Sequence, residues 1–284
     1  MRTKCIALAA TLVIGACGGA ASAPETPAPT GAPAFAYALP ESEPLLYELA
    51  DSGGFTMQIE GAGEVDVDVV GHATTQLDFE PQGDGFSVTV TVSDLSGTFT
   101  NSMGPTVTVG NEHRPPPAVL TVGHDGEVTM VDQPQFAAPL SQIFTPEGLY
   151  KGLFIRLPER AVEQGLAWTD TIRTEGTNEG MTVSTTSIVT SVWSRDTTVS
   201  GRKLAVIESR LQNTIEVSGT TQGMEIRQNL EGSGTATSLW DPAARVLVER
   251  IEIGQASGTT DLPTMGMTGM PVTAHSHQAL RLQR

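Results

Sequence analysis

Long stretches in which hydrophobic and polar residues alternate one by one constrain the fold of this chain most. From Phe86 to Val92, Phe and Val side chains fall on one face, and Ser and Thr hydroxyls fall on the other. The ranges Glu64 to Phe79 and Met181 to Arg195 show similar strand-like composition over about fifteen residues each. A period of two indicates half-buried β-strands. At about 3.3 Å per residue such strands approach about 50 Å, which is long for a globular sheet.

Long antiparallel strands normally twist and curl. Gly232 and Gly234 lie inside the predicted strand Asn229 to Trp240 and suit a bend in that curl. Turn-forming sequences predict four hairpins, at Pro81–Gly85, His124–Gly126, Val199–Gly201 and Trp240–Pro242. We therefore predict an all-β fold of long antiparallel strands in one or two curled sheets, either a half-barrel or a sandwich-like arrangement.

The centre of the chain departs from this pattern. Phe136, Leu140 and Ile143 have helical spacing, and Thr145-Pro146-Glu147 is typical of a helix start with proline at the first helical position. We predict one or two short helices between about residues 136 and 154. The expected organisation is a first β meander over residues 45–135, a helical linker over 136–157 and a second β meander over 158–284.

The first sixteen residues have the three zones of a secretory signal. Arg2 and Lys4 supply a positive start, a short apolar run follows, and small residues stand at its end. The apolar run, Cys5 to Ala16, has about twelve residues, whereas a membrane-spanning helix needs about 20. The segment is therefore predicted to be a cleaved export signal and not a transmembrane helix.

Ile14-Gly15-Ala16-Cys17 resembles the lipobox of bacterial lipoproteins. The resemblance implies cleavage before Cys17 and acylation of that cysteine, and several acyl chains anchor a protein stably to a membrane. In proteobacterial lipoproteins Asp after the cysteine marks inner-membrane retention. Gly18 stands there instead, which implies delivery to the outer membrane facing the periplasm. The alternative is an ordinary signal cleaved after Ala21 or Ala23.

Residues 17–44 are predicted to form the lipidated, disordered tether of the domain. The range from Gly18 to Pro44 holds six prolines among Ala, Thr, Glu and Gly, and little of it can be buried. The alternative is a segment packed on the domain, which Phe35 and Tyr37 would favour.

The charge and the cysteine count exclude several functions. Without Arg2 and Lys4, 14 basic side chains stand against 32 acidic ones, a formal net charge of −18. Such a surface repels phosphate backbones, so nucleic acid is not expected as a partner. Cys5 leaves with the signal and Cys17 carries lipid, and no other cysteine exists. An internal disulfide or a thiol-based activity is therefore excluded for the predicted mature chain.

The segment that enters the second meander has a proline, valine, glycine and tryptophan pattern, formed by Pro158, Val162, Gly165 and Trp168. This pattern resembles the one shared by a family of uncharacterised exported bacterial β proteins. The resemblance covers roughly residues 139 to 284 and implies a second β meander, with no assigned activity. The predicted curled sheet is also distantly similar to the curled half-barrels of lipoprotein carriers, although no carrier motif is matched.

Enzymatic motifs offer little. Ser200 and Lys203 have the Ser-x-x-Lys spacing of penicillin-binding enzymes, but that chemistry needs both residues one helical turn apart, and here they fall in a predicted hairpin. Nucleophile-elbow, phosphate-loop, zinc-protease and dinucleotide patterns do not occur in the sequence. We expect a protein that is not an enzyme and has no cofactor and no catalytic residues.

Two clusters remain as candidates for binding. Met265, Met267 and Met270 precede His275 and His277, and thioethers with imidazoles suit copper, although the methionines lie in a Gly-rich loop and the histidines fit an exposed strand face. No metal site is predicted. The aromatic residues could line an apolar cavity or form ordinary core, and core is the better interpretation; these are Trp168, Trp193, Trp240, Phe79, Phe86 and Phe99.

The leading hypothesis is a lipoprotein of the cell envelope, anchored to the membrane through Cys17, whose curved sheet binds an apolar ligand or lipid. The first alternative is a structural or protein-interaction module of the envelope, and a copper-binding protein follows. The two leading hypotheses differ in one observable property. An open concave face favours the ligand, and a concave face filled by side chains favours the interaction module.

Overall fold

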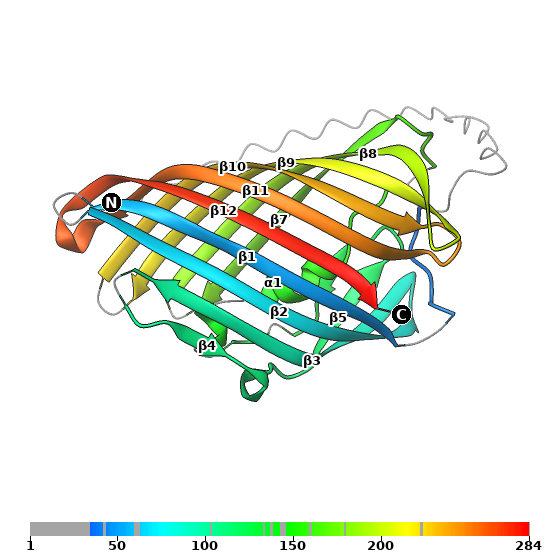
Figure 1. Cartoon of the computed structure of the whole chain (residues 1–284), viewed down its shortest axis with the longest axis horizontal. Helices are drawn as coiled ribbons and strands as arrows, with labels where there is room; N and C mark the ends of the chain where they lie inside the picture. Colours follow the sequence, from blue (N-terminus) through cyan, green and yellow to red (C-terminus); the bar gives the residue numbers. More distant parts are fainter. Residues whose placement is uncertain are drawn as a thin grey trace, which may run out of the picture. The chain divides into compact units, whose positions relative to one another are not determined.

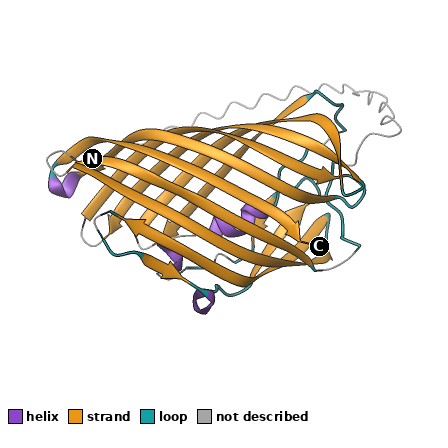
Figure 2. Cartoon of the chain, viewed as in Figure 1, coloured by secondary structure: helices purple, strands orange, loops and turns teal. Residues whose placement is uncertain are grey.

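Twelve strands form one antiparallel sheet in the computed structural model, which describes residues 35–41, 44–59, 63–102, 104–132, 134–136, 139–142, 146–158, 161–178, 180–221 and 224–283. The strands of the first meander are β1 Leu45–Ile59, β2 Gly63–Gln82, β3 Gly85–Asn101, β4 Val107–Val109, β5 Ala118–Gly123 and β6 Val128–Met130. Those of the second are β7 Ala167–Asn178, β8 Met181–Val199, β9 Arg202–Thr221, β10 Met224–Asp241, β11 Val246–Leu262 and β12 Met267–Gln283. The predicted all-β class is confirmed (Figure 2).

The two meanders continue into each other through the first and last strands. The strand order is β6-β5-β3-β2-β1-β12-β11-β10-β9-β8-β7, with β4 beside β3. Leu49 of β1 lies opposite Leu280 of β12 on one side and opposite Ala73 of β2 on the other. The sheet curls into a half-barrel, and β6 and β7 form its two edges (Figure 1). Of the predicted alternatives, a single curled sheet is the one observed.

All four predicted hairpin turns connect neighbouring strands. They join β2 to β3, β5 to β6, β8 to β9 and β10 to β11. In the β8–β9 turn Ser200 and Gly201 have positive φ angles of 50° and 80°, as a tight two-residue hairpin requires. Lys203 there lies 2.7 Å from the carboxylate of Asp196. This backbone is a hairpin and not the helical turn that Ser-x-x-Lys chemistry needs.

Glycines allow the strands to come close where the sheet curls. A Cβ atom on Gly234 would lie 2.8 Å from the carbonyl oxygen of Ile253 on the neighbouring strand. A Cβ atom on Gly258 would lie only 1.9 Å from the carbonyl oxygen of Asn229. Because a Cβ atom at such distances would collide with the neighbouring backbone, these two positions favour glycine.

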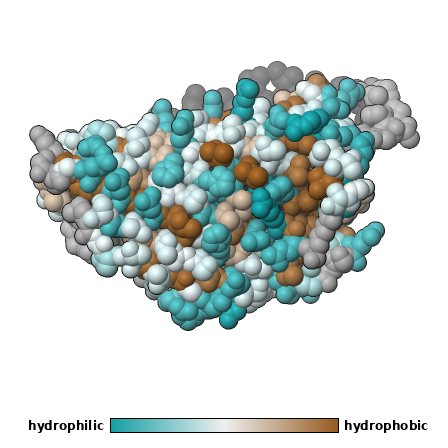
Figure 3. Space-filling view, viewed as in Figure 1, coloured by the Kyte–Doolittle hydropathy of each residue, from teal (hydrophilic) through white to brown (hydrophobic). Residues whose placement is uncertain are grey.

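The two faces of the sheet meet different environments. In β9, Leu211, Asn213 and Ile215 face inward and are buried or half-buried, whereas the residues between them are exposed. The outward face carries hydrophobic residues in small groups between hydrophilic ones, as Figure 3 shows for the surface over β1, β11 and β12. The alternation in the sequence therefore reflects an inner face and an outer face of one curled sheet.

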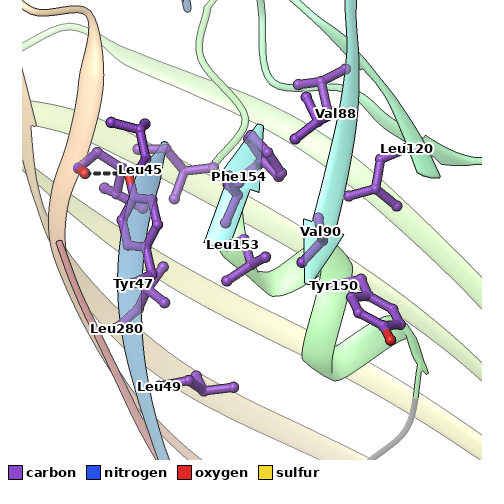
Figure 4. Packing of buried hydrophobic residues seen from close by; sticks show 14 of the residues in the cluster. Leu45, Tyr47, Leu49, Val88, Val90, Leu120, Tyr150, Leu153, Phe154 and Leu280 are labelled. Atoms are coloured by element: carbon purple, nitrogen blue, oxygen red, sulfur yellow. Dashed lines mark hydrogen bonds between the residues drawn. The ribbon is translucent and has the colours of Figure 1, made fainter. Parts of the chain in front are cut away.

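The linker lies inside the curl. It holds three short helical elements, η2 Leu140–Gln142, α1 Pro146–Tyr150 and η3 Lys151–Leu153. Leu149, Tyr150 and Leu153 are at most 1% exposed, and Leu153 and Phe154 point toward the inner face between β1 and β3 (Figure 4). The linker thus supplies the core of one end of the half-barrel. Ile143 and Thr145 of the predicted helix start lie outside the described residues.

Residues 35–41 correct the predicted extent of the tether. Phe35 and Tyr37 are 8% and 3% exposed, and their rings lie 5.6 Å from Trp193 and 4.9 Å from Trp240. The Tyr37 hydroxyl accepts a hydrogen bond of 3.0 Å from the backbone N–H of Ile155. Two aromatic rings recover enough apolar burial to order this part of a Pro-rich segment. The signal, Cys17 and the remainder of the tether up to residue 34 lie outside the described residues.

Two more helical elements occur outside the linker, η1 Asn111–His113 and η4 Pro263–Met265. Within the ranges that the structure describes, none of the helices has the length and apolar character needed to cross a membrane.

Candidate functional site: a cleft between the two edges of the sheet

A cleft of about 280 Å³ lies where the two edges of the sheet approach each other across the linker. We call it the lateral cleft. One wall is the edge strand β7, from Asp170 to Thr174, whose outer backbone groups pair with no further strand of the described sheet. The other walls are Gly126 to Val128, at the start of β6, and three linker residues, Lys151, Phe154 and Arg156.

Arg156 connects both edges of the sheet. Its Nε lies 2.8 Å from the carboxylate of Asp170 on β7, and its Nη1 lies 3.0 Å from Asp125 and 3.4 Å from Glu127 beside β6. Nη1 meets these carboxylates as ion pairs without an aligned hydrogen bond. Burial lowers the pKa of Arg156, but the carboxylates of Asp125, Asp170 and Glu127 raise it more, so the net pKa is raised. Arg156 therefore joins the two edges of the sheet through ion pairs with Asp125, Glu127 and Asp170, and we call this set of ion pairs the clasp.

The backbone beside Arg156 strengthens this clasp. The carbonyl of Arg156 accepts a hydrogen bond of 3.4 Å from the indole N–H of Trp168, at the start of β7. The backbone N–H of Leu157 donates a hydrogen bond of 2.7 Å to the carbonyl of Asp125. Side-chain and backbone contacts thus hold the linker to both edges at one place.

A second, deeper space of about 50 Å³ adjoins the lateral cleft, and we call it the inner chamber. Both spaces are lined by Phe154, Arg156, Asp170 and Ile172, so the Arg156–Asp170 ion pair stands where they meet. The remaining apolar walls are Ile155, Trp168, Val189 and Ile207. The chamber therefore lies on the inner face of β7 to β11, under the linker.

The floor of the inner chamber is polar. Ser191 and Ser209 are hydrogen-bonded to each other, with 2.8 Å between their hydroxyl oxygens. Ser238 is 2% exposed and lines the chamber, yet its hydroxyl makes no hydrogen bond with any residue that the structure describes. Arg250 forms an ion pair with Glu252, while its buried Nε has no acceptor among the described residues. Two hydrogen-bond donors therefore remain available at the floor.

An acidic residue lies on the same inner face beside this floor. Asp51 of β1 is opposite Gln278 of β12, which in turn is opposite Glu252 of β11. Burial raises the pKa of Asp51, and the nearby negative charge of Glu252 raises it further, while a backbone hydrogen bond and His277 act in the other direction. The guanidinium of Arg250 at the floor thus has two carboxyl groups on the same inner face near it, and the pKa of one of them, Asp51, is raised.

Beyond the linker the inner face is only partly covered. Phe55, Ile172 and Val183 face inward, yet they are 37%, 38% and 38% exposed. At the other end, Leu49, Leu280 and Ile207 also face inward and are at most 2% exposed, because the linker and residues 35–37 pack on them. The concave face is therefore filled under the linker, whereas at the far end exposed side chains such as Phe55 stand among buried ones such as Val67 and Val272.

The aromatic residues singled out in the sequence separate into two groups. Trp193, Trp240, Phe79 and Phe86 are at most 8% exposed and belong to the core, which agrees with the preferred interpretation. Phe99 is half-buried on the inner face. Trp168 is the member of the set that lines the inner chamber.

The methionine and histidine cluster does not converge in space. His275 and His277 are exposed on the outer face of β12, whereas Met270 is 5% exposed and faces inward. Met265 lies in η4 and is 54% exposed. Among the described residues, no group of three or more His, Cys, Asp or Glu is placed to hold a metal ion. The geometry offers no shared coordination site for these five side chains.

Sequence reasoning missed the residues that define the cleft and the chamber. Arg156 follows Phe154 in an irregular segment, and no local pattern distinguishes it from a surface arginine. Ser238 and Arg250 lie opposite each other on neighbouring strands. The one available signal was that Arg250 and Glu252 share their register with Gly254 and Ala256, which puts two charges on the face that carries small residues.

The segment that carried the family resemblance leads into the chamber wall. Val162 is 6% exposed in the core, and the backbone N–H of Gly165, at a φ of 89°, donates a hydrogen bond of 2.9 Å to the carbonyl of Trp193. Trp168 follows as the second residue of β7. These residues fix where the edge strand begins.

Comparison with known proteins adds no identity to this geometry. No protein-family model matches the chain. No curated protein matches it either.

Proposed function

We propose that the chain is a non-enzymatic lipoprotein of the cell envelope that binds an apolar ligand or lipid within its curled sheet. The lipobox-like Ile14-Gly15-Ala16-Cys17 supports anchoring through an acylated Cys17, and Gly18 supports the outer membrane facing the periplasm. In this proposal the membrane is reached through the lipid on Cys17, and the domain carries the binding site.

The observation that carries the proposal is the inner chamber and its connection to the lateral cleft. The half-buried Trp168 and Val189 and the buried Ile207 form the apolar wall of the chamber. The two spaces together reach the lower end of the range of about 300–1,000 Å³ that ligand sites occupy. A largely apolar wall with a few convergent polar groups is the usual composition of such sites.

The lateral cleft gives this site a side entrance. A ligand that enters from solvent would pass between β7 and the start of β6, beside the Arg156–Asp170 ion pair. The open part of the inner face, marked by Ile172, adjoins the same entrance. An apolar chain would exchange water for contact with Phe154 and Ile172, which favours binding by about 25 cal/mol for each Å² of apolar surface buried.

Native mass spectrometry of the Cys17→Ala chain, which cannot be acylated and is purified without detergent, tests the proposal. We expect a co-purifying lipid, or stoichiometric binding of an added ten-carbon chain such as methyl decanoate. Val189→Phe, which fills the chamber, should abolish binding. Ile188→Phe is the matched control, because Ile188 is exposed on the opposite face of the same strand. A chain that neither carries nor binds such molecules would refute the proposal.

A second candidate function is a protein-interaction module of the envelope. It is favoured by the filled end of the half-barrel, where Tyr37, Phe154 and Trp240 pack edge to face. Affinity purification from envelope extracts would favour this function if one partner is recovered and no lipid accompanies the chain.

A further inference from the structure

The polar floor of the inner chamber carries an inference about the ligand itself. We infer that the chamber binds the polar end of the ligand, and that this end is an uncharged hydrogen-bond acceptor such as an ester carbonyl, held by Ser238 and Arg250. The inference rests on the proposed function and names the chemistry that the same site would select.

Two hydrogen-bond donors at the floor have no acceptor among the described residues. Ser238 is 98% buried, lines the chamber and makes no hydrogen bond within the described ranges, and the Nε of Arg250 is buried without an acceptor there. Buried polar groups in proteins almost always have a partner, because each one left unpaired costs about 1–3 kcal/mol. A group that enters the chamber and satisfies both donors would remove this cost.

The two donors, Ser238 and Arg250, restrict the kind of ligand group that can bind at the floor. A guanidinium donates hydrogen bonds and accepts none, and a hydroxyl can donate to a carbonyl oxygen. An ammonium group only donates hydrogen bonds, so it would leave both donors unsatisfied. A plain alkyl end would leave Ser238 and Arg250 unpaired. The floor therefore selects an acceptor.

The charged groups near the floor decide whether the acceptor is neutral or anionic. Arg250 already forms an ion pair with Glu252, and Asp51 lies on the same face beside Glu252, close enough for the charge of Glu252 to raise its pKa. A carboxylate ligand would add a negative charge where one carboxyl group already resists ionisation. An ester or amide carbonyl supplies the acceptor without that charge, so it should bind better than the corresponding acid anion.

The positions of the polar floor and the apolar wall determine the orientation of the ligand. The floor residues Ser238 and Arg250 lie beneath the wall of Trp168 and Ile207, and Phe154 and Ile172 lie between this wall and the lateral cleft. A ligand with its carbonyl at the floor would lay its chain along this apolar path toward the gap between β6 and β7. The expected ligand is thus a single acyl chain that enters carbonyl first.

Isothermal titration of the Cys17→Ala chain with four probes that share a ten-carbon chain tests the inference: methyl decanoate, decanoate, decylamine and decane. Methyl decanoate should bind about tenfold more tightly than decane, and it should also bind more tightly than decanoate and decylamine. Ser238→Ala should weaken methyl decanoate binding about three- to tenfold, the loss of one hydrogen bond, and leave decane binding unchanged. Ser233→Ala, on the outer face of the same strand, is the matched control and should change neither.

Equal affinities for methyl decanoate and decane, an unchanged affinity in Ser238→Ala, or tightest binding of decanoate would each overturn the inference while leaving the apolar site in place. If none of the four probes binds the parent chain, the proposed function itself fails. The two failures are therefore distinguishable in one series of titrations.

Discussion

Replacement of Arg156 by methionine removes the ion pairs that join the two edges of the sheet. Asp125 and Asp170 are 22% and 30% exposed, so each carboxylate would lose its cation in a partly desolvated place. Exposed ion pairs contribute about 0.2–1 kcal/mol, and breaking a buried pair costs about 3–5 kcal/mol. The geometry here lies between these cases, and Glu127, 70% exposed, adds little. We expect a loss of about 2 kcal/mol in the free energy of unfolding.

Urea denaturation followed by tryptophan fluorescence measures this loss, and a thermal scan should show a decrease in Tm of about 4–8 °C. Arg195→Met is the matched control, because Arg195 pairs with Glu208 between adjacent strands and both side chains are at least half exposed. It should cost less than about 0.5 kcal/mol. Hydrogen exchange should also accelerate in Gly126–Val128 and Asp170–Thr174. Equal effects of both substitutions, with unchanged exchange, would refute the clasp.

Three further predictions follow from the fold and the sequence. Burial and a neighbouring carboxylate raise the pKa of Asp51 above 3.8, so its contribution to stability becomes unfavourable as the pH rises through the folded-state pKa; Asp51→Asn should raise Tm at pH 7 and have no effect near pH 3. Gly258→Ala places a Cβ atom against the carbonyl of Asn229 and should cost about 1–3 kcal/mol in chemical denaturation, whereas Gly104→Ala, whose Cβ would meet only Asn101 at an ordinary contact distance of 4.0 Å, should cost far less. Cys17→Ser should abolish metabolic labelling with palmitate and move the protein out of the membrane fraction; retained labelling would contradict the anchor.

Alternation made the class of fold predictable, because a period of two over 15 or more residues is incompatible with helix. Turn chemistry placed the hairpins at Pro81–Gly85 and Val199–Gly201, where the strands do reverse. The pairing of β1 with β12 could not be predicted in the same way. It brings Leu49 opposite Leu280, and no local pattern encodes a contact over such a separation.

The segment before β1 shows where composition misleads. Its prolines and small residues indicate a tether, and composition averages over the two residues that matter, Phe35 and Tyr37. Their burial depends on Trp193 and Trp240, which stand far away in the sequence and become neighbours only after the sheet has curled.

The inner chamber was out of reach for a related reason. Alternation identifies two faces of a strand, but β10 and β11 carry polar residues on both, so alternation alone does not show that Ser238 and Arg250 face inward. These two residues are enclosed by the linker, which includes Arg156, and its position depends on the folded sheet. The walls were more accessible, since Trp168 was already singled out as a residue that either lines a cavity or forms core.

The most direct test of an apolar ligand site inside the half-barrel is photo-crosslinking of a ten-carbon methyl ester that carries a diazirine in its chain. After illumination with the Cys17→Ala chain, peptide mass spectrometry identifies the labelled residues. The account predicts labels on the inner face, at Trp168, Ile172, Val189 and Ile207, and competition by unlabelled methyl decanoate. Labels confined to outward-facing residues such as Ile188, or labelling that no competitor reduces, would contradict it.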